Sequence, residues 1–131
     1  MPWQFQKHYT EDEARALLPQ VCGWLDQLGQ LKEQLARHDE RLAARLAAGH
    51  DLGGDPASQW LKAVVAFKGL LEEFARREIQ VKDLDRGLVD FPAFVGGREV
   101  FLCWERGEED IEYWHDLESG YAGRERLRPK A

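Results

Sequence analysis

The 131-residue sequence has few cysteines, no long apolar run and no excess of basic residues, and each lack excludes a class of protein. Cys22 and Cys103 are its two cysteines, too few for the disulfide framework of a small secreted domain. No run approaches the ~20 apolar residues of a membrane-spanning helix, and the first residues do not resemble a secretory signal. Lys and Arg number 18 against 24 Asp and Glu, which disfavours a nucleic-acid binder. We therefore expect a cytoplasmic protein without nucleic-acid or membrane partners.

The first two thirds of the chain has the periodicity of two long helices. Thr10 and Glu13 form a capping-box pair, so a first helix should begin there, bend at Pro19 and run to about Ala48. Apolar residues recur along it at every seventh position, as in a coiled coil: Val21, Leu28, Leu35 and Leu42. A second helix is expected over about 57–80. The short loop between the two predicts an antiparallel hairpin.

Three strands are expected after the helices. Segments 88–95 and 98–105 flank Gly96-Gly97, a two-residue hairpin signal that pairs Val89 with Trp104 and gives one wholly apolar face. Pro92 suggests that the first of these strands lies at an edge. A third strand over 110–116, after a four-residue turn, would pair His115 with Val100 on the same buried face.

These elements predict a single α+β domain over residues 1–131. A long antiparallel helical hairpin, over about 10–80, packs on a three-stranded antiparallel β-meander over about 88–116. Residues 117–131 form a loop and tail.

Six segments carry a family resemblance: Tyr9–Ala14, Leu17–Pro19, Lys82–Pro92, Leu102–Glu108, Tyr113–Asp116 and Gly120–Arg124. Together they resemble the bacterial family known as the domain of unknown function 2203, over nearly the whole chain. The resemblance implies a bacterial, cytoplasmic protein, and it implies no activity, cofactor or ligand.

A metal site has candidate ligands of suitable type: Asp83, Asp85, Asp90, Cys103, Glu108, His115 and Asp116. The predicted register argues against it, because Cys103 and His115 would project from opposite faces of the sheet. No CxxC or HExxH spacing occurs either. We therefore expect no metal and no cofactor, with an oxygen-only site from the first three aspartates as the open alternative.

Catalysis has weak support, because no serine or cysteine has the context of an activated nucleophile. His115 on an apolar face is expected to be a hydrogen-bonded core residue rather than a base. Arg124, in a Gly-x-x-Gly-Arg setting, either binds an anion or pairs with a carboxylate such as Asp85 or Asp90. The candidate ligand-binding residues are Asp85, Asp90, His115, Asp116 and Arg124.

The second face of the predicted sheet carries Phe94, Phe101 and Trp114 among charged residues, which suggests a surface that binds a protein partner. The alternative is that the N-terminal segment, with Trp3 and Phe5, folds back over them. The first helix is expected to be longer than the second. The apolar heptad positions that the second helix leaves uncovered favour a homodimer. The leading hypothesis is a non-enzymatic interaction or scaffold domain that self-associates. The alternative is a small-molecule- or metal-dependent enzyme, with an acidic site near the helix-to-sheet connector and the C-terminal loop.

Overall fold

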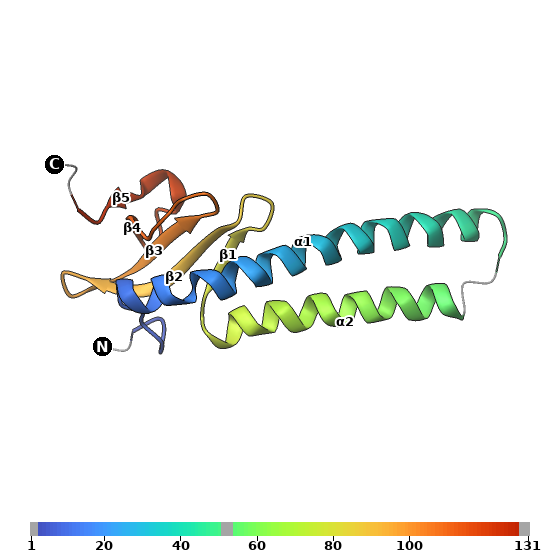
Figure 1. Ribbon diagram of the computed structural model, residues 1–131, viewed down its shortest axis with the longest axis horizontal. Coiled ribbons are helices and arrows are strands. Elements are labelled where there is room, and N and C mark those ends of the chain that lie inside the picture. Colours follow the sequence, from blue (N-terminus) through green and yellow to red (C-terminus); the bar gives the residue numbers. More distant parts are fainter. Residues whose placement is uncertain (1–2, 51–53, 129–131) are drawn as a thin grey trace.

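The computed structural model describes residues 3–50 and 54–128. A helical hairpin extends from a five-stranded antiparallel sheet (Figure 1). The α+β class is confirmed, whereas the sheet has two strands more than the three expected. Residues 51–53 of the predicted interhelical loop and 129–131 of the predicted tail lie outside the described residues. None of the described helices combines the length and hydrophobicity needed to cross a bilayer.

The helices are α1, Glu11–Ala47, and α2, Asp55–Arg76. The capping box is formed as predicted, because the Thr10 side chain accepts a hydrogen bond from the Glu13 amide while the Glu13 carboxylate accepts one from the Thr10 amide. α2 ends four residues earlier than expected. Glu78 adopts a φ of 57°, a left-handed conformation that a right-handed helix cannot continue, and the chain then enters the sheet.

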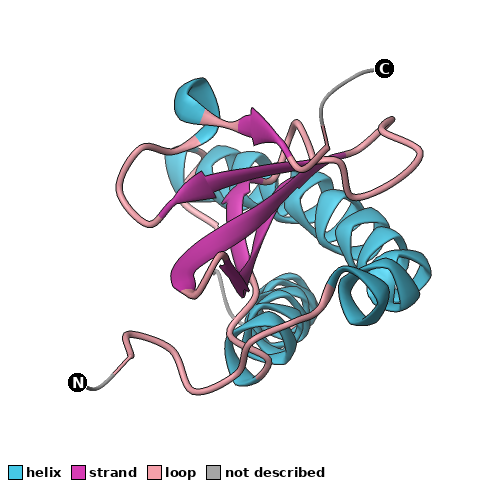
Figure 2. Cartoon of the chain, turned by 90° about the vertical axis from the view of Figure 1, so that its left-hand side faces the viewer, coloured by secondary structure: helices cyan, strands magenta, loops and turns pink. Residues whose placement is uncertain are grey.

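The core lies between the first half of α1, the end of α2 and one face of the sheet, and Figure 2 shows the helices together on one side of the strands. α1 contributes Leu18, Val21, Leu25 and Leu28. Each such buried side chain stabilises the fold by about 1.5–3 kcal/mol. Beyond Leu28 no residue of α1 is buried, and the far half of the hairpin projects past the sheet (Figure 1).

The sheet has the order β1-β2-β3-β4-β5, with neighbours antiparallel. Its strands are β1 Gln80–Asp83, β2 Leu88–Val95, β3 Arg98–Glu105, β4 Tyr113–Asp116 and β5 Glu125–Arg126. The β2–β3 register is confirmed, from Val95 opposite Arg98 to Val89 opposite Trp104. The two extra strands are short and polar, so the alternation that reveals longer strands does not mark them.

β2 is not an edge strand, so the prediction made from Pro92 is wrong. β1 pairs with β2 only as far as Asp90. Beyond that point the Tyr9 amide donates to the Pro92 carbonyl oxygen over 2.7 Å. Pro92 therefore lies in the part of β2 that β1 leaves unpaired, where a missing N–H costs no ladder hydrogen bond.

The predicted register of β4 is wrong by one residue. Val100 pairs with Asp116 and Phe101 with His115. Residues 106–112 form a longer loop than the predicted turn. Two hydrogen bonds stabilise its start: the Trp104 indole donates to the Glu108 carbonyl oxygen, and the Glu105 amide donates to the Glu108 carboxylate. A one-residue slip turns every side chain of a strand to the other face. His115 therefore lies on the face away from the helices.

Candidate metal centre

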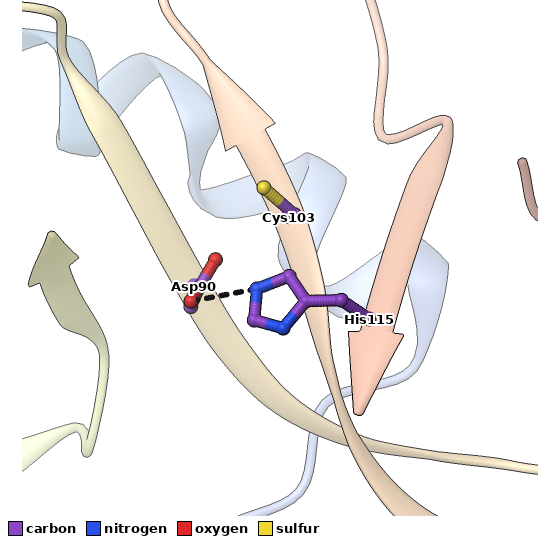
Figure 3. A group of neighbouring side chains, drawn as sticks. All are labelled: Asp90, Cys103 and His115. Atoms are coloured by element: carbon purple, nitrogen blue, oxygen red, sulfur yellow. Dashed lines mark hydrogen bonds and ion pairs between the residues drawn. The ribbon is translucent and has the colours of Figure 1, made fainter. Parts of the chain in front are cut away.

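Three neighbouring strands bring Asp90, Cys103 and His115 together on the sheet face away from the helices (Figure 3). Asp90 on β2 lies directly opposite Cys103 on β3, and His115 reaches in from β4. One ligand atom from each residue lies within 4.8 Å of the other two. All three residues are buried, with exposures of 1%, 0% and 2%. The argument against a shared metal, that Cys103 and His115 face opposite ways, is therefore wrong.

The His115 ring is oriented by two hydrogen bonds. Nδ1 lies 2.6 Å from the Asp116 carbonyl oxygen, which can only accept, so Nδ1 carries a proton. Nε2 then faces Asp90 Oδ2 at 2.9 Å. Burial disfavours the charged ring, but the hydrogen bonds to Asp90 and the Asp116 carbonyl outweigh burial and raise the pKa of His115. The contact with Asp90 therefore favours the protonated ring of His115.

Asp90 has a second oxygen, Oδ1, that is buried and has no hydrogen-bond partner of normal geometry among the described residues. An unsatisfied buried oxygen of this kind costs about 1–3 kcal/mol. Such atoms are few in native proteins and call for a specific explanation. A cation beside Cys103 and His115 would supply one.

The Cys103 thiol is held in its protonated form. Burial raises its pKa to about 12, with the Asp90 carboxylate adding to the effect and Arg124 opposing it. Arg124 Nη1 lies 4.0 Å from Cys103 Sγ, and Arg124 Nη2 lies 2.7 Å from Glu108 Oε2, with which it forms an ion pair. The Arg124 guanidinium also stacks 3.8 Å from the centre of the Tyr113 ring. A thiol of this pKa is a poor nucleophile, whereas a bound metal would displace its proton.

A cavity of about 220 Å³ adjoins the centre on the solvent side. Asp90 and His115 form part of its wall. The other residues around it are Lys82, Leu88, Phe101, Leu117, Glu118, Gly120 and Tyr121. A metal held by the three strand residues would therefore lie beside this cavity, which two of its ligands line.

Of the other predicted ligand-binding residues, Asp116 and Arg124 contact members of the centre, whereas Asp85 lies apart from it. Asp116 contributes its carbonyl to His115, while its carboxylate accepts the amides of Glu118 and Ser119. Asp85 is exposed and pairs with Lys32 at 2.7 Å. Arg124 pairs with Glu108, not with the predicted Asp85 or Asp90.

The seven predicted metal ligands are brought together only in part. Within 3–50 and 54–128, Asp90, Cys103 and His115 are the one group of three such side chains close enough to share an ion. The oxygen-only alternative is therefore not formed. The confirmed β2–β3 register puts Cys103 opposite Asp90. That pairing was the available signal.

The proposed partner-binding residues do not form one open surface. Phe101 is 3% exposed and packs 5.3 Å from the Phe5 ring. Phe94 stacks on His8 at 4.0 Å, with Trp3 against its edge. Trp114 pairs with Leu102 and packs against the core on the opposite face. The N-terminal segment thus covers Phe101, whereas Phe94 is contacted by His8 and Trp3 and stays 43% exposed, so the predicted cover is formed only in part.

Comparison with known proteins gives one match. A family model described as "Uncharacterized conserved protein (DUF2203)" matches residues 7–127. The match covers all three residues of the centre and the loops around it. No curated protein and no solved structure matches the chain.

Proposed function

The chain belongs to the DUF2203 family of uncharacterised conserved proteins, and we propose that it binds a divalent transition-metal ion through Asp90, Cys103 and His115. The observation that carries the proposal is the buried Asp90 carboxylate: one of its oxygens lies within 4.8 Å of a thiol sulfur and an imidazole nitrogen, and Oδ1 has no hydrogen-bond partner among the described residues. A buried polar atom is costly unless it has a partner, and an ion shared by the three ligands would satisfy Oδ1, which the Asp90–His115 contact leaves unsatisfied.

Zn²⁺ is the ion that suits these ligands best. Nitrogen, sulfur and carboxylate oxygen are its ordinary ligands, whereas Mg²⁺ and Ca²⁺ take oxygen alone. The thiolate and the carboxylate would balance its two positive charges. The hydrogen bond from His115 Nδ1 to the Asp116 carbonyl is the outer contact that commonly orients a metal-binding histidine.

Three protein ligands with a fourth position open to a cavity are typical of catalytic zinc sites, whereas structural sites are closed by four. This favours the metal-dependent reading of the chain over a purely structural ion. The reaction class is set by what the cavity binds.

The test uses Co²⁺ as a spectroscopic substitute for Zn²⁺ in metal-stripped protein. One equivalent of Co²⁺ is expected to give a sulfur-to-cobalt charge-transfer absorption, and Zn²⁺ is expected to displace it and raise the melting temperature. Cys103→Ser should abolish the band, while Cys22→Ser, which alters the other, half-buried cysteine, should keep it. A wild-type protein without the band would contradict the proposal.

We also propose that the hairpin self-associates with a second copy of the chain. α1 has 37 residues and α2 has 22, but Figure 1 shows that the extra length of α1 lies beside the sheet, so the overhang expected from the sequence is not present at the free end of the hairpin. Leu61 and Val65, one turn apart on α2, are 55% and 62% exposed. Two large apolar side chains on one helix face, in the part of the molecule that projects beyond the sheet, favour helix-to-helix packing between copies.

Mass measurement in solution tests this second proposal. Leu61→Glu with Val65→Glu should shift a dimer to monomer, while Lys62→Glu, on a neighbouring exposed position, should leave the mass unchanged. A wild-type protein that is monomeric at every concentration tried would end the proposal.

A further inference from the structure

The cavity beside the centre combines an apolar wall with a cation that has no carboxylate partner. Leu88, Phe101 and Leu117 supply the apolar wall. Lys82 Nζ lies 5.3 Å from the centre of the Phe101 ring. Among the described residues, no carboxylate lies within ion-pair distance of Lys82. Its charge is therefore available to a ligand.

The size of the cavity limits the ligand to a small molecule. A volume of about 220 Å³ corresponds to roughly seven water-sized groups, since water takes about 30 Å³ in the liquid. This is below the 300–1,000 Å³ of pockets that hold drug-sized ligands. A cavity of this size suits a short-chain organic acid better than a nucleotide.

The charged groups around the cavity favour a negatively charged ligand. With a divalent ion bound, Asp90 and the Cys103 thiolate together neutralise the ion, and Lys82 is left as a cation at the cavity. Glu118 lines the same cavity and opposes an anion. The coordination position open to the cavity also favours an anionic donor, because an anion interacts with both the metal and Lys82.

Resting on the proposed metal site, we infer that this cavity binds a small carboxylate with an apolar body. The carboxylate faces the metal and Lys82, and the body lies against Leu88, Phe101 and Leu117. The substrate class of the site is thus a short-chain, apolar organic acid.

The experiment titrates the Co²⁺-loaded 131-residue chain with 3-methylbutanoate, an acid of seven non-hydrogen atoms, and follows the visible absorption of the cobalt. The neutral isostere 3-methylbutanamide is the matched ligand control. The acid should change the visible bands, and the amide should bind at least about tenfold more weakly, as expected for loss of a charge-assisted contact.

Three variants locate the contact. Lys82→Met should weaken binding of the acid about tenfold, and Glu118→Gln should strengthen it. Lys68→Met, at an exposed lysine of α2, should change nothing. None of the three should alter the sulfur-to-cobalt band, because none is a metal ligand.

The outcomes separate the two proposals. A normal sulfur-to-cobalt band with visible absorption that the acid does not change overturns the carboxylate site and leaves the metal site standing. Equal affinity for acid and amide, or an unaffected Lys82→Met, also overturns it. Loss of the band in the wild type overturns both.

Discussion

His115 Nε2 lies 2.9 Å from Asp90 Oδ2, with both side chains only 2% exposed. The contact joins β2 to β4 across the intervening β3. Removing one member of a buried ion pair leaves an uncompensated charge in a low-dielectric environment.

Asp90→Ala is therefore expected to destabilise the metal-free protein by about 3–5 kcal/mol, the usual cost of breaking a buried pair from one side. Urea unfolding measures the loss. Asp85→Ala is the control, because the exposed pair of Asp85 with Lys32 contributes about 0–1 kcal/mol. Equal small losses in the two variants would show that the Asp90–His115 contact carries no special weight.

The two cysteines are expected to differ in reactivity. In metal-free protein at neutral pH, iodoacetamide should modify the half-buried Cys22 and leave Cys103 untouched until the chain unfolds. The reason is that Cys103 is fully buried and its pKa is about 12, so almost no thiolate forms. Peptide mapping by mass spectrometry distinguishes the sites. Modification of Cys103 in the folded protein at the rate of Cys22 would contradict the described burial.

The N-terminal segment is expected to depend on Glu99. This carboxylate accepts the amides of Gln4 and Phe5, each at 2.9 Å, and contacts His8 Nε2 at 2.7 Å. Glu99→Gln should accelerate hydrogen exchange at both amides by about tenfold or more, since each 1.4 kcal/mol is a factor of ten. Glu109→Gln, at an exposed glutamate of the β3–β4 loop, is the control. Unchanged exchange would mean that aromatic packing alone holds the segment.

The same contact predicts a pH dependence. Burial works against ionisation of Glu99, but the hydrogen bonds from His8, Phe5 and Gln4 outweigh it and lower the pKa of Glu99. Because the folded-state pKa is lowered, the stabilisation is complete above the unfolded value of about 4.3 and is lost as the pH falls through the folded pKa. The Phe5 amide proton resonance should therefore titrate with a midpoint below about 4.3. A midpoint above that value would mean that folding raises the pKa of Glu99, which would contradict the prediction.

Gly87 is expected to be irreplaceable by alanine. Its φ is 66°, and an added Cβ would lie 2.7 Å from Arg106 Cβ. Gly87→Ala should cost about 2–5 kcal/mol, the sum of left-handed strain and overpacking. Gly96→Ala is a matched control, with a φ of 58° and nothing within 4 Å of its Cβ, and should cost about 1–2 kcal/mol. Thermal unfolding of both variants gives the comparison. Equal losses of stability would show that the close approach of Arg106 does not add to the cost at Gly87.

Local sequence determined the features that depend on near neighbours. The Thr10–Glu13 capping box fixed the start of α1, because both partners lie within one helical turn. Gly96-Gly97 fixed the β2–β3 register, because a two-residue turn leaves one pairing that gives a wholly apolar face. That register alone already set Asp90 opposite Cys103.

Tertiary structure decided where His115 lies. Within the loop over 106–112, Glu108 makes local contacts with Trp104 and Glu105. Long-range ion pairs, Arg106 with Asp26 and Asp110 with Arg15, hold the loop against α1, and no turn motif in the sequence specifies its length. Because strand side chains alternate with a period of two, a change of one residue in the register moves His115 from the core face to Asp90 and Cys103. The fold class follows from short-range patterns, whereas the centre exists because a loop closed by long-range packing set the register of one strand.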